Sequence, residues 1–114
     1  MDRISYFNLP VDSTPRSKHN PWRTLRAVAV PRDFVLVKID IDNSPIEEAL
    51  IAELLADYAL AGLMDELYFE HHVRDSPMWH YGWHVNTVTN QTLKHSYDIF
   101  GKLREMGIRA HSWV

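Results

Sequence analysis

The sequence predicts an α/β domain, a partial doubly wound sandwich of three layers with a mostly parallel sheet and flanking helices. Three observations support this fold class. An apolar run, Asp33 to Asp42, ends in two carboxylates; strong helix-start signals follow it; and a second strand-like run covers Asp65 to Val73. A strand, a helix and a second strand in this order form a βαβ unit, which is almost always right-handed.

Length and composition exclude several classes of protein. A chain of 114 residues accommodates one domain with one core. The formal net charge is -3, and nucleic-acid binding normally requires a basic patch, so we expect no nucleic-acid partner. The chain has no cysteine, which excludes disulfides and thiolate zinc sites. We find no signal peptide or membrane-spanning run, so a cytoplasmic location is the default expectation.

The first predicted strand, Phe34–Asp40, is the centre of the domain. Its nearly continuous apolar character is typical of a strand buried on both faces of a parallel sheet. Open α/β sheets bind ligands outside the carboxyl ends of their strands, where Asp40 and Asp42 lie. Lys38 is costly inside a strand unless it is paired, and Asp40 or Glu70 is the simplest partner.

Capping signals place the helices. Asn20 followed by proline begins a short helix, after an irregular segment over residues 1–19. Ser44 with Glu47 three residues later predicts a capping box at the start of the next helix, which extends toward Gly62. The last helix is expected over residues 91–106.

Two further strands complete the predicted sheet. The second strand, Asp65–Val73, ends in Glu70, His71 and His72, where alternation puts Glu70 and His72 on one side and His71 on the other. A carboxylate beside an imidazole is suited to general base chemistry. Residues 108–114 are expected to form the third strand.

The expected topology leaves one face of the sheet without its own helices. Right-handed crossovers between strands in sequence order place both helices on the same face, so only residues 1–32 remain to cover the other. The edge beside Phe34–Asp40 is also open to pairing. We therefore expect the chain to be the C-terminal half of a larger doubly wound domain. Its open face would be covered by a missing N-terminal half, by a homodimer partner, or by the N-terminal segment folding across it.

The connection over residues 74–89 is rich in large side chains. Long loops of this kind are usually functional or disordered, and the aromatic residues argue against disorder. Trp79 and Trp83 either line a substrate pocket or fill a gap in the core.

Three segments resemble FkbM-type S-adenosylmethionine-dependent methyltransferases and their plant and algal relatives. The segment Asp33 to Asp42, which is followed by a helix, resembles that family's fourth-strand motif. The segment Leu63 to His72 resembles the next strand, and Tyr97 to Trp113 resembles the end of these proteins; the similarity covers roughly residues 20–114.

The resemblance implies a Rossmann-like methyltransferase fold, S-adenosylmethionine as cofactor and O-methyl transfer. It places the catalytic residues at Asp40, Glu70 and His71, near the acceptor. The implied substrate-binding residues are Asp42, His72, Trp79 and Trp83.

Two departures from the family pattern qualify that expectation. Asn43 stands where the fourth-strand motif has glycine. The glycine-rich cofactor-binding turn after the first strand is absent, since Gly62, Gly82, Gly101 and Gly107 lie at no strand-to-helix turn. We therefore expect a truncated or inactive methyltransferase-like domain.

Two other functions remain open from the residues alone. Asp40-Ile41-Asp42 matches the Asp-x-Asp pattern by which glycosyltransferases hold manganese on a sugar nucleotide. The open sheet edge also fits a non-catalytic interaction module that pairs with another chain.

Overall fold

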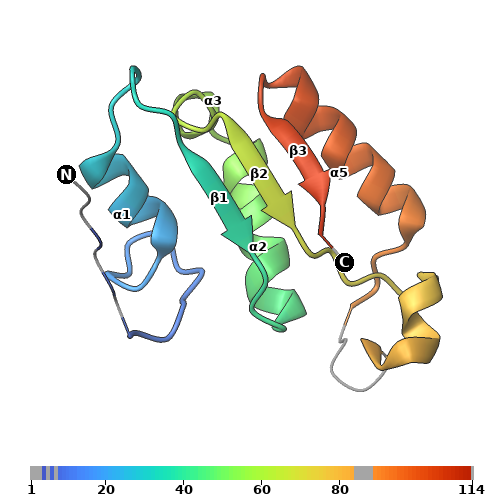
Figure 1. Ribbon diagram of the computed structural model, residues 1–114. Coiled ribbons are helices and arrows are strands. Elements are labelled where there is room, and N and C mark those ends of the chain that lie inside the picture. The colour runs from blue at the N-terminus through green and yellow to red at the C-terminus, as the bar shows by residue number, and fades with distance from the viewer. Residues whose placement is uncertain (1–3, 5, 7, 84–88, 114) are drawn as a thin grey trace.

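A computed structural model (Figure 1) describes residues 4, 6, 8–83 and 89–113 of the chain. Its sheet has the strands β1 (Leu36–Ile39), β2 (Glu66–Phe69) and β3 (Arg109–Ser112). They are parallel and lie in the order β1-β2-β3, with Val37 aligned to Leu67 and Leu67 to Ala110. The predicted parallel sheet with strands in sequence order is confirmed. Each strand is shorter than predicted, and β1 and β2 end just before Asp40 and Glu70.

The described helices are α1 (Pro21–Val28), α2 (Ser44–Leu55), α3 (Tyr58–Ala61), the 3-10 helix η1 (Pro77–Tyr81) and α5 (Leu93–Glu105). Figure 1 shows α2 and α5 lying behind the same face of the sheet. Apolar side chains of that face form one core with the helices, which includes Leu50, Leu54, Leu67, Phe69 and Leu103. Among the described helices, none is long and apolar enough to cross a membrane.

The opposite face of the sheet is not covered by any described helix. On β1 the side chain of Leu36 is 51% exposed, and Phe34 just before the strand is more exposed still. The prediction that this strand is buried on both faces is therefore wrong, and the predicted third layer is missing from the described part of the chain. The apolar composition of the strand does not distinguish a covered face from an open one.

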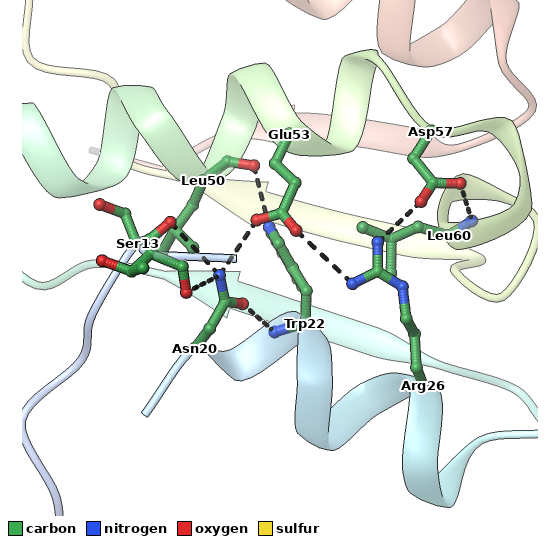
Figure 2. A network of polar contacts seen from close by, with 9 residues as sticks. Ser13, Asn20, Trp22, Arg26, Leu50, Glu53, Asp57 and Leu60 are labelled. Atoms are coloured by element: carbon green, nitrogen blue, oxygen red, sulfur yellow. Dashed lines mark hydrogen bonds and ion pairs between the residues drawn. The ribbon is translucent and has the colours of Figure 1, made fainter. Parts of the chain in front are cut away.

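The segment before β1 packs on the helical side of the sheet. Asn20 caps α1, since its Oδ1 accepts from the Trp22 amide at 2.8 Å. The Trp22 side chain is buried against α2, where its Nε1–H donates to the Leu50 carbonyl at 2.9 Å (Figure 2). Arg26 pairs with Asp57 at the start of α3 at 2.7 Å. Helix α1 therefore extends the layer of α2 and leaves the open face uncovered.

The start of α2 differs from the predicted capping box. Asn43, not Ser44, is the N-cap, and its Oδ1 accepts from the Ile46 amide at 3.3 Å. The single helix expected toward Gly62 is divided into α2 and α3, because Asp57 caps a new helix through the Leu60 amide at 3.0 Å. Both differences have the same cause, because an Asn or Asp side chain that was not predicted as a cap accepts from a helix amide.

Candidate functional site

The carboxyl ends of β1 and β2 bring four polar side chains together. We call Asp40, Asp42, Glu70 and His72 the rim cluster. Asp40 and Glu70 are hydrogen-bonded to one another, and Glu70 Oε1 lies 2.7 Å from His72 Nε2. His72 Nε2 also lies 3.6 Å from Asp42 Oδ1. The strands are parallel neighbours, so their ends deliver these groups to one edge, as the sequence predicted.

Asp40 and Glu70 have opposite pKa shifts. The hydrogen bond from Glu70 and then the one from Lys38, at 2.8 Å, hold the pKa of Asp40 below its ordinary value. Burial raises the pKa of Glu70, and the hydrogen bond to Asp40 raises it further. Glu70 is therefore the member of the pair that holds a proton more readily, and in its protonated form it donates to the Asp40 carboxylate. Such a divergence between neighbouring carboxyls is common at functional sites.

His72 is the buried centre of the cluster. Its ring stacks on Trp83, with centroids 4.3 Å apart and an interplanar angle of 18°. One donor atom each from Asp42, Glu70 and His72 lie within 4.8 Å of one another, a spacing that suits a divalent cation. Asp42 reaches this position from a left-handed backbone conformation with φ 53°.

His71 lies on the other side of the strand end. Its ring stacks on Phe69 at 5.1 Å, and its Nε2 lies 2.5 Å from Gln91 Oε1. Burial lowers the pKa of His71 and so favours the neutral form of its ring, although the hydrogen bond with Gln91 opposes this shift. The alternation expected from the sequence is thus confirmed, and His71 is not among the rim side chains.

Glu47 is a buried group at the edge of the site that sequence reasoning assigned only to a helix cap. Its Oε1 accepts from the Asn43 amide at 3.1 Å and from the Ile41 amide at 3.3 Å. Burial raises the pKa of Glu47, and these two amides oppose that shift. Glu47 therefore fixes the turn that presents Asp42 to the cluster.

The two tryptophans of the long connection have different positions. Trp83 covers His72, whereas Trp79 lies in η1, where its amide donates to the Ser76 carbonyl at 3.0 Å. A third tryptophan, Trp113, was not singled out from the sequence. It lies beneath the Lys38 ammonium, 4.5 Å from Nζ to the ring centroid. Residues 84–88 of the same connection lie outside the described part of the chain.

Comparison with known proteins adds no assignment. No protein family, curated protein or solved structure matches the chain.

Proposed function

We propose that the chain is a methyltransferase-like α/β domain of the S-adenosylmethionine-dependent O-methyl transfer type, whose rim cluster binds the acceptor hydroxyl and takes its proton. The observation that carries this proposal is the hydrogen-bonded arrangement of Asp40, Glu70 and His72 at the ends of two parallel strands. Ligands of open α/β sheets bind at this edge. A partly buried carboxyl with a raised pKa is suited to exchanging a proton near neutral pH.

The rim cluster fits the cofactor in part. When bound, S-adenosylmethionine supplies a methyl group carried by a sulfonium cation. Carboxylates such as Asp40 and Asp42 attract that positive charge and accept hydrogen bonds from ribose hydroxyls. The amides of Ile41 and Asn43 in the turn after β1 do not donate to the cofactor, because they already donate to Glu47. The proposal therefore implies weak cofactor binding by this chain.

Three residues of the rim cluster and two neighbouring residues have distinct roles in the proposal. Glu70, once ionised, accepts the proton of the acceptor hydroxyl, and Asp40 stays ionised beside Lys38 and hydrogen-bonds to the bound ligand. His72 orients the Glu70 carboxylate, and Trp83 shields the imidazole from water. His71 acts as a positioning residue, since it fixes the strand end through Gln91.

Titration of the isotope-labelled chain with S-adenosylmethionine tests the proposal. We expect saturable changes in the amide NMR signals of Asp40, Glu70 and His72, with a dissociation constant on the order of 1 mM. S-Adenosylhomocysteine, which lacks the sulfonium charge, is expected to bind more weakly. Asp40→Asn should weaken binding, whereas Glu105→Gln, an exposed carboxylate on α5, should not. The methyltransferase assignment fails if neither compound moves the rim signals at several millimolar.

A divalent-cation site is the second candidate, and one observation favours it. The donor atoms of Asp42, Glu70 and His72 converge within 4.8 Å, although Asp40 of the Asp-x-Asp pattern is not in that group. In this alternative the cation holds the diphosphate of a sugar nucleotide. Manganese would then broaden the NMR signals of these three residues, and Asp42→Asn would remove the effect. Uniform or absent broadening excludes this candidate.

A further inference from the structure

The open face of the sheet presents a compact patch of aromatic and cationic side chains. We call this surface the open face. It consists of Phe34, the strand residues whose side chains point to the same side of the sheet, and the residue that directly follows β3. These are Leu36, Lys38, Glu66, Tyr68, Arg109, His111 and Trp113. The side chains of Val37, Ile39, Leu67, Phe69 and Ala110 point the other way, into the core. Parallel sheets occur almost only with both faces covered, so this exposure indicates a surface that is covered when the protein functions.

The aromatic side chains of the open face are held in place by one another. Tyr68 stacks on His111 with centroids 4.8 Å apart, and Trp113 meets Tyr68 edge-on at 6.0 Å. Lys38 lies over the Trp113 ring. A partner that docks here pays little side-chain entropy, because these rings are already ordered by contacts within the chain.

The charge exposed on this face is positive. The Arg109 side chain is 67% exposed and its contact with Glu66 is long, at 3.8 Å. Lys38 is 45% exposed and pairs at 2.8 Å with Asp40, which is less exposed, at 26%. Glu66 is only 17% exposed and lies 2.8 Å from His111 Nε2. The carboxylate of Glu66 therefore lies beneath the cations, although the whole chain has a formal net charge of -3. Two copies placed face to face would oppose like charges, and an acidic partner is complementary.

The size of the face fits a helix. Three strands about 4.8 Å apart, each with about five residues at ~3.3 Å per residue, present an area roughly 15 Å wide and 17 Å long. A helix with its side chains is about 10–12 Å wide. The face alone is on the order of 300 Å², well below the ~800 Å² per partner of a standard protein–protein interface, so it suits one helix rather than a large flat surface.

The edges of the sheet are less suitable for a partner than its face. At the outer edge of β3, Arg104 donates from Nε and Nη2 to the Ala110 carbonyl, at 3.2 and 2.9 Å. At the other edge, α1 lies on the side of β1 away from β2 (Figure 1). An occupied edge carbonyl disfavours pairing with another strand.

We propose that the open face binds an amphipathic helix of a partner polypeptide, with an apolar stripe flanked by acidic residues. The apolar stripe packs on Leu36, Tyr68 and Trp113, and the acidic flanks pair with Arg109 and Lys38. This site adjoins the rim cluster through Lys38, which pairs with Asp40, but its occupation does not depend on the proposed methyltransferase chemistry.

Two synthetic helical peptides with the same apolar stripe test the proposal, one flanked by glutamate and the other by lysine. We expect the glutamate peptide to give saturable NMR changes at Leu36, Tyr68 and Arg109 and to alter Trp113 fluorescence. The lysine peptide should bind at least about tenfold more weakly. Arg109→Glu should reverse or abolish the preference, and Lys102→Glu, an exposed residue of α5 behind the other face of the sheet, should not.

Trp113→Ala provides a second variant in case Arg109→Glu perturbs the fold, which circular dichroism would reveal. It should lower the affinity for the glutamate peptide several-fold. The proposal is overturned if neither peptide binds at millimolar concentration, if the NMR changes map to α2 and α5, or if both peptides bind equally. It is also overturned if dilution of the free chain changes the same signals, because a second copy would then be the occupant.

Discussion

Replacing Trp22 with alanine is expected to destabilise the domain by about 3–5 kcal/mol, the usual cost of truncating a fully buried aromatic side chain. Trp22 is 1% exposed and belongs to the main core. Its Nε1–H also donates to the Leu50 carbonyl across the contact between α1 and α2 (Figure 2). A domain of this size is stable by about 5–15 kcal/mol, so the loss is a large share of the total.

Urea unfolding followed by circular dichroism measures this effect. Trp113→Ala is the matched control, since Trp113 is 41% exposed on the open face, and we expect that variant to lose only about 1 kcal/mol. Trp22→Phe should lose less than Trp22→Ala, because the aromatic ring fills most of the cavity. Equal stability of Trp22→Ala and the wild-type chain would show that α1 is not packed on α2.

Replacing Glu47 with alanine is expected to destabilise the domain by about 1–3 kcal/mol, because it removes a buried carboxyl that accepts from the amides of Ile41 and Asn43. Glu47→Gln retains an acceptor oxygen and removes the buried charge, so we expect a change of less than about 1 kcal/mol. The difference between the two variants separates the hydrogen bonds from the charge.

The pH dependence of Glu47→Gln has a defined sign. Burial raises the pKa of Glu47 in the folded state, so the folded chain holds this proton more tightly than the unfolded chain does. The stability that the chain gains from protonated Glu47 is fully present below the pKa of this group in the unfolded chain. It is lost as the pH rises through the pKa of the same group in the folded chain. Glu47→Gln should therefore gain stability relative to wild type as the pH rises from acidic to neutral. A constant difference would contradict the assignment of a buried carboxyl.

Much of the fold could be predicted from local chemistry. The apolar runs, the cap at Asn20 and the helix start expected at Ser44 predict the order of strands and helices, and right-handed crossovers then fix the common helical face. The alternation along β2 correctly separates Glu70 and His72 from His71. These features depend on neighbours in sequence, where backbone periodicity applies directly.

Other features depend on contacts that no local pattern contains. Phe34 and Leu36 have the composition of core residues but lie on an uncovered face. The stacking of Trp83 on His72 comes from a long connection without periodicity. Glu47 has the sequence position of a capping residue, yet it accepts from two amides of the preceding turn and so orders the rim.

At the ends of β1 and β2, Asp40 and Glu70 form one hydrogen-bonded pair. Carboxyl NMR of the labelled chain across a pH titration tests this pairing directly. We predict that Asp40→Asn lowers the pKa of Glu70, because Asp40 helps to raise it, and that Glu105→Gln leaves it unchanged. An identical Glu70 titration curve in wild type and Asp40→Asn would contradict it.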